Sequence, residues 1–558
     1  MASIYSQLLF LTTSPRSPEK MIAEIELLIN KFKGKEWNNE TQTAFMKVLG
    51  EEDFYHGIGK NDPAFSARDR INRAPKSLGF VTLKPCIQIT SAGQQLLSAK
   101  RKDEVFLRQM LKFQLPSPYH KPTEKAAKYC VKPYLEILRL VRTMGTLKFD
   151  ELQIFGMQLI DYHNFDLIVE KIKAFRIAKA QNKGSYRVFK MDYLHRELTT
   201  IYKERIAKGE TKTRESNDKS LKKFLDTQAS NMRDYADACF RYLRVTGLVS
   251  VSHIGKSLSI VQERVSDVDY ILKTVSRDPI VFSKESEYAA YLGEASTPTL
   301  LTDDKKLIIN KIKKEFPLSD ISTKSTIFEL KDLLANLLEK RKNETLQSQI
   351  EQIKDYRLYN EIQKTFDQIV NNELYDNPLM LEWNTWRAMT MLDGGTIKAN
   401  LNFDDYGKPL STAAGNMADI ICDYGDYYVC VEVTMATGQK QYEMEGEPVM
   451  RHLGKLKTST NKPCYCLFIA PTINDACVTY FYTLHHVNLA LYGGKSIIIP
   501  IPLDIFKKMI EDSYKAEYTP NPNHVRLFFE NSNSLAKSTD NEVEWYEGIK
   551  NKALHWLE

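Results

Sequence analysis

The chain contains 558 residues, of which 43% are hydrophobic, 11% aromatic and 27% charged. This length exceeds what one hydrophobic core supports and predicts about two to four domains. No segment approaches the roughly 20 consecutive apolar residues of a transmembrane helix, and the N-terminal segment lacks the basic region of a signal peptide. The eight cysteines form no Cys-x-x-Cys pair, which favours a reduced, cytoplasmic protein without structural zinc.

Charge is distributed unevenly along the chain. Residues 1–298 contain 48 Lys and Arg against 35 Asp and Glu, a net charge of +13, whereas residues 299–558 contain 29 against 36, a net charge of −7. A basic half joined to an acidic half is typical of a polyanion-binding module attached to a module with another role. No basic amphipathic anchor for a membrane stands out, so the sequence favours nucleic acid as the partner.

Two segments of the basic half share one pattern. Residues 65–97 and 231–261 each begin with a basic helix carrying an Arg-Asp pair, then turn at a glycine (Gly79 or Gly247) into a short two-stranded ribbon. The helical stretch 134–157 opens the second module. A helix, a turn and a ribbon form the end of a winged helix-turn-helix, whose helix enters the DNA major groove. A generic α+β domain with solvated arginines is the alternative interpretation.

The basic half is therefore predicted to hold two winged-helix-like DNA-recognition subdomains, residues 1–130 and 131–298. A basic stretch over residues 201–223 is predicted to be a mobile connector that touches phosphates. Arginine bound bidentately to guanine is the commonest specific base contact, but most protein–DNA contacts go to phosphate, and the sequence does not separate the two classes. The candidate DNA-contacting side chains are Arg16, Lys20, Arg68, Arg70, Arg73, Arg233, Arg241 and Arg244.

The acidic half begins with helical periodicity. Apolar residues recur at three- and four-residue spacing over residues 299–372, which predicts a helical linker. The rest of the chain, residues 373–558, is predicted to be an α/β domain. Its expected elements are, in order, a helix over 380–392 carrying Glu382, a loop containing Ala413 to Asn416, a hairpin over 418–434, a short helix that begins at Pro448, and two buried strands separated by a helix around 473–488.

The hairpin, ADIICDYGDYYVCVEVT, is the most informative segment. A glycine at the first central position of a two-residue loop suits a II′ turn, so Gly425-Asp426 sets the strand register. This register places Asp419 opposite Glu432, where Cβ atoms are roughly 4.5–5.5 Å apart and like charges are destabilising. A divalent cation would explain the pair, since Mg²⁺ takes one or two carboxylates together with substrate phosphate oxygens. A protonated carboxyl group, or a partner Lys or Arg, would also explain it.

The whole chain also resembles a known family. The order of expected elements in residues 373–558 is similar to the PD-(D/E)xK nuclease core. Several segments resemble the AlwI family of type IIS restriction endonucleases, which includes PleI, MlyI and the BstNBI nicking enzyme. These segments are SPRSPEK (14–20), AFSARDR (64–70), LEWNTW (381–386), AAGNMADI (413–420), VEVT (431–434) and EGEPVMRH (445–452).

The resemblance implies an N-terminal DNA-recognition region, a helical linker and a C-terminal nuclease domain in a prokaryotic cytoplasmic enzyme. Members of the family read short asymmetric sites resembling GAGTC or GGATC and cut a few base pairs outside them. The restriction interpretation implies a companion DNA methyltransferase. Because one chain carries one acidic cluster, it cuts one strand per encounter, and double-strand cleavage needs a second copy or a partner nuclease chain. Nicking and double-strand cleavage both remain open.

Carried over residue by residue, the resemblance assigns the active site to Glu382, Asp419, Glu432, Glu445 and His452. Asp419 and Glu432 would be the main Mg²⁺ ligands, with the Val433 carbonyl and Glu382 beside them. Thr434 stands where the general motif has lysine, and Ala418 where it has proline. The group that orients the attacking water is therefore open among Glu445, Lys440, Gln441 and His452, with Glu445 ranked first.

Three other interpretations remain open on the sequence alone. His452 could have a structural role and cap a loop carbonyl. The whole protein could be a non-catalytic winged-helix DNA-binding regulator, which would explain the basic half but not the opposed carboxylates. It could also be a PD-(D/E)xK repair or transposition nuclease, which would cut according to DNA structure and not sequence.

Overall fold

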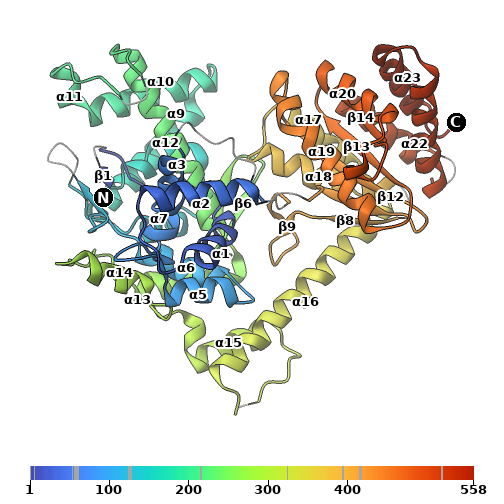
Figure 1. The fold of residues 1–558 in the computed structure, drawn as a ribbon. Helices are drawn as coiled ribbons and strands as arrows, with labels where there is room; N and C mark the ends of the chain where they lie inside the picture. Colours follow the sequence, from blue (N-terminus) through green and yellow to red (C-terminus); the bar gives the residue numbers. More distant parts are fainter. Residues whose placement is uncertain are drawn as a thin grey trace. The chain divides into compact units, whose positions relative to one another are not determined.

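The computed structural model describes residues 2–4, 7–52, 54–55, 62–122, 128–213, 216–322, 324–392, 395–413, 417–516 and 520–558. The chain is a mixed α+β protein whose small sheets are covered by helices (Figure 1). It divides into two compact units, Met1–Leu337 and Leu338–Glu558. Among the helices of the described residues, none is long and apolar enough to cross a membrane.

The first unit begins with a helical region that contains the first predicted ribbon. Asp62 caps α3, accepting a 2.8 Å hydrogen bond from the Phe65 amide, and Pro63 takes the first helical position, where its missing N–H is not needed. Gly79 has a φ of +81° and leads into the antiparallel ribbon. The elements are α1 (Lys20–Phe32), α2 (Asn39–Glu51), α3 (Pro63–Ile71), α4 (Ala74–Ser77), β2 (Val81–Thr82), β3 (Gln88–Ile89), α5 (Ser91–Ser98) and α6 (Asp103–Lys112). Strand β1 (Ala2–Ile4) pairs in parallel with β4 (His120–Pro122).

The second predicted ribbon belongs to a three-stranded antiparallel sheet. Its strands lie in the order β5-β7-β6, and Gly145 and Gly247 both have positive φ at the turns that follow α7 and α12. The elements are α7 (Pro133–Met144), β5 (Thr146–Lys148), α8 (Phe149–Ile154), α12 (Leu221–Arg244), β6 (Val249–Ser252) and β7 (Ser257–Ile260). One face of α12 is buried, through residues such as Met232 and Phe240. The order is helix, strand, helix, then a long helix and a ribbon.

Three further helices are inserted between α8 and α12: α9 (Phe165–Gln181), α10 (Tyr186–Ile201) and α11 (Lys203–Ala207). The predicted mobile connector over residues 201–223 is therefore helical at both ends. Residues 214–215 of it lie outside the described residues. The helical start of the connector has a physical cause, since the Arg205 guanidinium lies over the Tyr202 and Phe224 rings and joins α11 to α12.

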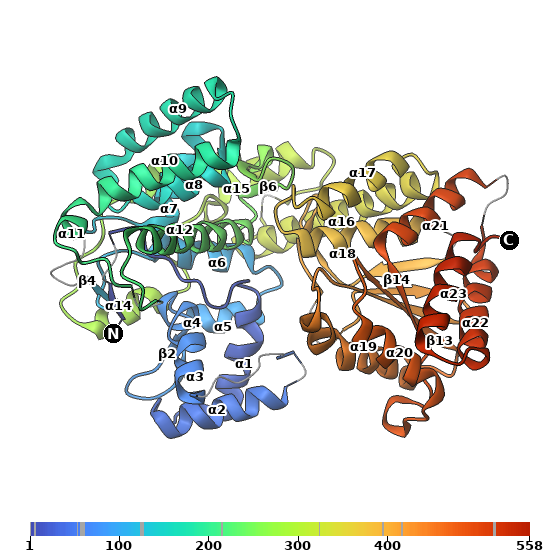
Figure 2. The ribbon, with the colours of Figure 1, turned by 90° about the horizontal axis from the view of Figure 1, so that it is seen from above.

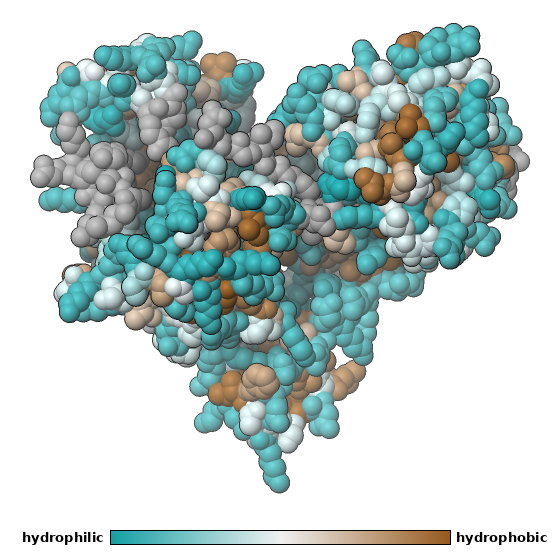
Figure 3. All heavy atoms as spheres, viewed as in Figure 1, coloured by the Kyte–Doolittle hydropathy of each residue, from teal (hydrophilic) through white to brown (hydrophobic). Residues whose placement is uncertain are grey.

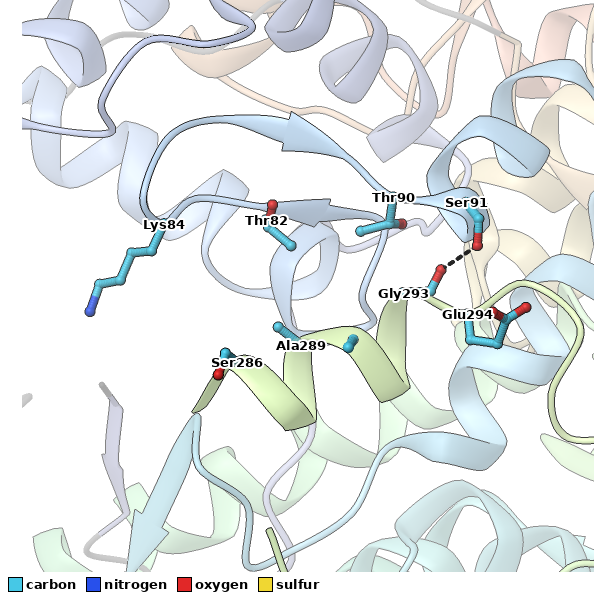
Figure 4. Close-up of a pocket in the computed structure, with 9 residues that line it drawn as sticks. Thr82, Lys84, Thr90, Ser91, Ser286, Ala289, Gly293 and Glu294 are labelled. Carbon is cyan, nitrogen blue, oxygen red and sulfur yellow. Dashed lines mark hydrogen bonds between the residues drawn. The ribbon is translucent and has the colours of Figure 1, made fainter. Parts of the chain in front are cut away.

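A surface cavity of about 390 Å³ lies between the β2–β3 ribbon and α14 (Glu285–Gly293) (Figure 4). The Ser91 hydroxyl donates a 2.7 Å hydrogen bond to the Gly293 carbonyl at its edge. The backbones approach closely here, since a Cβ on Gly293 would lie 3.0 Å from the Thr90 side chain. The cavity is lined by Thr82, Lys84, Thr90, Ser91, Ser286, Ala289, Ala290, Gly293 and Glu294, none of which is a predicted site residue.

The predicted linker region is helical. After α13 (Val265–Thr274) and α14, the chain forms α15 (Lys305–Glu315), α16 (Ile327–Lys354) and α17 (Tyr359–Val370). The boundary between the two units falls within α16. Helix α17 belongs to the second unit, because Ile362, Phe366 and Ile369 are buried in its hydrophobic core.

The second unit is a five-stranded mixed sheet with helices on both faces. The order is β14-β13-β12-β11-β8, with β8, β11 and β12 antiparallel and β12, β13 and β14 parallel. Helices α18 and α21 cover one face, with α17 packed on α18, and α19 and α20 cover the other (Figure 2). The strands are β8 (Thr396–Ala399), β11 (Ile420–Asp423), β12 (Tyr428–Val433), β13 (Cys464–Ala470) and β14 (Ile498–Pro502).

The helices of this unit are α18 (Asn377–Leu392), α19 (Gln439–Ser459), α20 (Asp475–His486), α21 (Leu503–Lys515), α22 (Pro522–Ser538) and α23 (Glu542–Leu554). Helices α22 and α23 pack against each other and against α20. A separate two-stranded ribbon joins β9 (Asn402–Phe403) to β10 (Pro409–Ser411). On the face shown in Figure 3, most of the surface is hydrophilic and the hydrophobic residues form small patches.

The predicted hairpin and its register are confirmed. Ile420 pairs with Val431 and Asp423 with Tyr428, and the Tyr424 amide donates a 3.1 Å hydrogen bond to the Tyr427 carbonyl. Gly425 has a φ of +84°, as the first central position of a II′ turn requires. Extended by one residue, this register sets Asp419 opposite Glu432.

The predicted start of a helix at Pro448 is wrong. Helix α19 begins at Gln439, after Gly438 with a φ of +61°, and Pro448 lies inside it. A proline inside a helix removes the hydrogen bond to the carbonyl four residues earlier. That residue, Met444, lies on the exposed side of the helix, at 51% exposure. Glu445 therefore lies on a continuous helix and not in a preceding loop.

Candidate active site

Four carboxylates of the second unit come from separate elements. Glu382 lies on α18, Asp419 directly precedes β11, and Glu432 lies near the end of β12. Glu445 lies on α19, seven residues before His452, so the two side chains share one face of that helix. Hence the antiparallel hairpin and the helices on its two sides supply all five residues that the family resemblance assigns to the active site.

Two of the carboxylates are held by backbone amides. Asp419 Oδ2 accepts a 2.9 Å hydrogen bond from the Val433 amide, and Glu382 Oε1 accepts a 2.8 Å hydrogen bond from the Ala413 amide. The second bond ties α18 to the loop before β11. Of the loop predicted to lie here, Ala414 to Asn416 fall outside the described residues. Glu382 is only 3% exposed and Glu432 only 5%, so both charges are largely removed from water.

Burial and mutual repulsion destabilise the ionised forms of these groups. Burial raises the pKa of Glu382, Asp419 and Glu432 well above the usual range of a carboxyl group. The charge of Asp419 further raises the pKa of Glu382, that of Glu432 raises the pKa of Asp419, and that of Glu445 raises the pKa of Glu432. Burial also raises the pKa of Glu445, and a hydrogen bond from the Thr434 hydroxyl opposes this rise.

In the part of the chain that is described, the charge of Arg451 acts to lower the pKa of Glu432, but burial and the other carboxylates outweigh it. Within the described residues, none of the four carboxylates forms an ion pair with lysine or arginine, and Glu432 pairs only with His452. In the described part of the chain, no three of these carboxylates have oxygens that all lie within 4.8 Å of one another. Mg²⁺ commonly takes one or two carboxylates and fills its other positions with water and substrate phosphate. The donor chemistry here, with the Val433 carbonyl added, is compatible with that arrangement.

His452 is linked to the cluster through one ring nitrogen. Its Nδ1 lies 2.8 Å from Glu432 Oε1, and burial, with the charges of Arg451 and Lys455, lowers the pKa of His452 to about 4. In the tautomer that carries its proton on Nδ1, the neutral ring donates to Glu432 and Nε2 is an acceptor. Nε2 is buried and has no hydrogen-bond partner among the described residues. Its contact is with a carboxylate and not with a loop carbonyl.

The structure separates the candidates for orienting water. Gln441 is fully buried and fully used, because Nε2 donates 2.9 Å hydrogen bonds to the Ala436 and Thr472 carbonyls and Oε1 accepts one of 2.7 Å from the Asn474 amide. Lys440 is exposed. Of the candidates, Glu445 and His452 lie against Thr434 and Glu432 respectively.

The predicted DNA-contacting residues fall into two places in the first unit. Arg68 and Arg70 lie on α3, where Arg68 donates hydrogen bonds to Asn39 and Gln42 of α2 and Arg70 pairs with Glu24 of α1. The others lie in the segment before α1, at the start of α1, beside that segment, or on α12. Arg73 bonds Thr13, and Arg16 and Arg241 both bond Asp237. Lys20 and Arg233 are exposed, whereas Arg244 is buried.

Sequence reasoning missed Asp237. Its spacing of four from Arg241 on a helix is a signal for that ion pair, but nothing in the sequence indicates that Arg16, 221 residues away, binds the same carboxylate.

A second cluster of metal-ligand side chains lies in the first unit. Among the described residues, Cys130, Asp161 and His163 are the set of three whose donor atoms lie within 4.8 Å of one another. Asp161 caps the short helix Tyr162–Asn164, accepting hydrogen bonds of 3.0 Å from the His163 amide and 2.7 Å from His163 Nδ1. These local hydrogen bonds account for the position of His163 beside Asp161.

Comparison with known proteins assigns the chain to a family. A family model described as AlwI restriction endonuclease matches residues 76–509, which is more than half of the sequence. The chain belongs to the AlwI restriction endonuclease family. The matched AlwI region contains α12 and all five residues of the acidic site, and it identifies the protein as a restriction endonuclease. No curated protein is similar enough to serve as a relative.

Solved structures give weaker matches. The small subunit of the heterodimeric restriction endonuclease R.BspD6I is 25% identical, with 37% of this chain and 95% of that chain covered and a TM-score of 0.27. The BpuJ1 endonuclease binding domain is 13% identical over 49% of this chain and 92% of that chain, with a TM-score of 0.32. Restriction endonuclease FokI is 11% identical over 92% and 97%, with a TM-score of 0.23. The AlwI assignment therefore rests on the family model.

Proposed function

We propose that this AlwI-family chain is a Mg²⁺-dependent type IIS endonuclease of the PD-(D/E)xK superfamily. It binds a short asymmetric duplex site resembling GAGTC or GGATC and hydrolyses a phosphodiester bond a few base pairs outside it. The observation that carries the proposal is the cluster of Glu382, Asp419, Glu432 and Glu445, which has no lysine or arginine ion-pair partner among the described residues. Glu382 and Glu432 are buried, and Asp419 and Glu445 are partly buried. Such a cluster is costly to leave ionised without a cation.

Each residue of the cluster has a proposed role. Asp419 and Glu432 would hold the metal together with the Val433 carbonyl, and Glu382 would add negative charge from α18. When bound, Mg²⁺ lowers the pKa of a water molecule and stabilises the leaving 3′ oxygen. Glu445 accepts a hydrogen bond from the attacking water and orients it toward phosphorus. His452 keeps the Glu432 carboxylate in place through Nδ1 and can accept a proton from a water molecule at Nε2.

The first unit is the proposed DNA-recognition region, with winged-helix-like subdomains over residues 1–130 and 131–298. Support comes from the order α7, β5, α8, α12, β6, β7 and the strand order β5-β7-β6, which suit a helix that enters the major groove and a ribbon beside it. Residues 299–372 form the helical linker and residues 373–558 the nuclease domain in this proposal.

Cleavage of both strands would require more than one chain. One chain has one acidic cluster, so it acts on one strand at a time. Either the protein nicks DNA as a monomer, or a second copy or partner nuclease chain cuts the other strand after transient association. A companion methyltransferase would protect the host genome.

The proposal is tested by incubating the purified protein with supercoiled plasmid, with Mg²⁺ or with EDTA, and sequencing the ends of the products. We expect Mg²⁺-dependent cleavage at a fixed distance from a short asymmetric site. Open circles would identify a nicking enzyme and linear molecules a double-strand cutter. Glu432→Gln, prepared identically, excludes a contaminating nuclease, and Glu547→Gln on the exposed face of α23 is the matched control. An uncut plasmid with a specific gel shift would refute the nuclease and favour a non-catalytic DNA-binding regulator.

A further inference from the structure

The segment that precedes α1 lies against α12 (Figure 2). The Tyr242 hydroxyl donates a 3.0 Å hydrogen bond to the Pro15 carbonyl, and Arg16 Nε donates one of 2.9 Å to Asp237 Oδ2. The Phe10 ring packs edge-on against Tyr235 of the same helix, with 5.9 Å between the centroids. These contacts follow α12 over two turns, so Arg16 forms part of the surface of this helix.

The guanidinium of Arg16 forms a hydrogen bond through Nε, and its two terminal nitrogens remain available to a ligand. Its side chain is 73% exposed, whereas that of Asp237 is 14% exposed. In the described part of the chain, Arg16 bonds only to Asp237, through Nε, so its two terminal amino groups have no protein partner. Those amino groups match the O6 and N7 acceptors of a guanine in the major groove. A guanidinium already fixed through Nε loses less conformational freedom when it binds.

Stability alone does not explain this arrangement. Asp237 Oδ2 also accepts a 3.1 Å hydrogen bond from Arg241 Nε, and the Arg241 side chain is mostly buried. Asp237 is therefore neutralised without Arg16. An additional ion pair with a largely exposed arginine contributes little to folding, whereas an arginine oriented by a carboxylate is well suited to bind a ligand.

The surface of α12 next to Arg16 has mixed polarity. Arg233 and Asp234 are both 62% exposed, and Arg233 donates a 3.3 Å hydrogen bond to the Ser230 hydroxyl. A surface that bound only phosphates would need hydrogen-bond donors and positive charge, and no exposed carboxylate. Base edges present acceptors and donors alternately, and a surface that carries both an arginine fork and an exposed carboxylate matches them better.

We propose that Arg16 reads a guanine of the recognition site through the major groove and that Asp237 is the residue that positions it. The proposal rests on the proposed function, because it requires the first unit to bind a specific duplex. It separates Arg16 from Lys20, an exposed cation at the start of α1 that would contact phosphate.

The experiment first defines the wild-type recognition site by sequencing cleavage ends. Each base pair of that site is then replaced in turn, and the dissociation constant of every duplex is measured in EDTA. The proteins are the wild type, Arg16→Ala, Arg16→Lys, Asp237→Asn and the control Lys20→Ala. Thermal unfolding of each variant reports whether folding is intact. We expect Arg16→Ala to lose roughly 10- to 100-fold of the preference for one G·C pair, with discrimination at the other positions unchanged.

The other variants sharpen this result. Arg16→Lys keeps the charge but lacks the fork, so it should also lose the preference at that pair, and Asp237→Asn should lose part of it at the same pair. Lys20→Ala should weaken binding to all duplexes equally. Unchanged discrimination in Arg16→Ala, or an equal loss of affinity for every duplex, would overturn the inference. If the wild type shows no sequence preference at all, the proposed function fails instead.

Discussion

Buried carboxylates have opposite surroundings in the two units. In the first unit, Glu136 is fully buried and accepts hydrogen bonds of 2.9 and 2.6 Å from Arg277. Glu151, also buried, accepts hydrogen bonds of 2.7 and 2.8 Å from Arg176. In the second unit, Glu432 is also buried, at 5% exposure, and it has no lysine or arginine ion-pair partner among the described residues. Its side-chain partner there is the ring of His452, whose pKa is lowered to about 4.

The difference separates structural from functional charge. A buried carboxylate with a bidentate arginine is already neutralised, and removing either partner leaves the other uncompensated. A buried carboxylate beside other carboxylates remains uncompensated, so its surroundings are optimal only after a cation binds. The first kind stabilises the fold, whereas the second kind is stabilised by a ligand. This comparison makes opposite predictions for the same substitution, glutamate to glutamine, in the two units.

The largest expected effect is on catalysis. Glu432→Gln should lower the rate of Mg²⁺-dependent DNA cleavage at least about 1000-fold, because it removes a proposed metal ligand. The same substitution should leave the free energy of unfolding in EDTA unchanged or higher, because it relieves repulsion with Asp419 and Glu445. Single-turnover cleavage and urea denaturation measure the two effects. A variant that is inactive because it is unfolded would contradict the comparison.

The second effect is on stability. Glu136→Gln should lower the free energy of unfolding by about 2 kcal/mol, less than the roughly 3–5 kcal/mol of a fully buried ion pair, because Arg277 is partly exposed. Cleavage by the variant that remains folded should keep its Mg²⁺ dependence. Urea denaturation checks the first statement and cleavage over a Mg²⁺ titration the second. If Glu136→Gln were neutral for stability, pairing with arginine would not distinguish structural carboxylates from the others.

The third effect is on the pH dependence of stability without metal. Burial raises the pKa of Asp419 and Glu432 in the folded protein above their ordinary values of 3.8 and 4.5. The stability that their protonated forms supply is fully present below those ordinary values and is lost as the pH rises through the raised ones. In EDTA the melting temperature of the second unit should therefore fall as the pH rises from about 4 toward neutrality.

Each fully shifted group can contribute at most about 1.4 kcal/mol per pH unit. Mg²⁺ should reverse the fall by stabilising the ionised forms. The double variant Asp419→Asn, Glu432→Gln is the control and should show a weaker pH dependence. The pKa of Asp103 in the first unit is shifted in the opposite direction. Burial acts to raise this pKa, but Arg101 and Arg264 hold it below its usual value. A melting temperature of wild-type protein in EDTA that rises over the same range would contradict the assignment.

The sequence alone predicted those elements whose structure is decided by neighbouring residues. A two-residue loop with glycine first leaves one register for the hairpin, so the opposition of Asp419 and Glu432 followed from the chain alone. The helix carrying Glu382 followed from its apolar pattern. The ribbons after Gly79 and Gly247 are also local features, because the glycines supply the positive φ at the turns.

Long-range packing could not be predicted in this way. Pro448 has a strong local preference for the start of a helix, yet α19 continues through it because Gln441 fastens its first turn to Ala436 and Thr472. The burial of Arg244 and the shared pairing of Asp237 also depend on segments far apart in sequence. Charge and residue type suggested candidates for DNA contact, but only the fold shows which of them are exposed.

The smallest expected effect concerns the hairpin on which the acidic pair depends. Gly425→Ala should lower the free energy of unfolding by about 1 kcal/mol, because a side chain at a φ of +84° is strained. Apart from the two adjacent residues, no atom of the described part of the chain lies within 4 Å of the added Cβ, so packing adds nothing. Since the register would be kept, the Mg²⁺ concentration for half-maximal cleavage should not change. A shift in that concentration would mean that the turn strain reaches Asp419, and that the position of the acidic pair depends on the turn conformation as well as on the register.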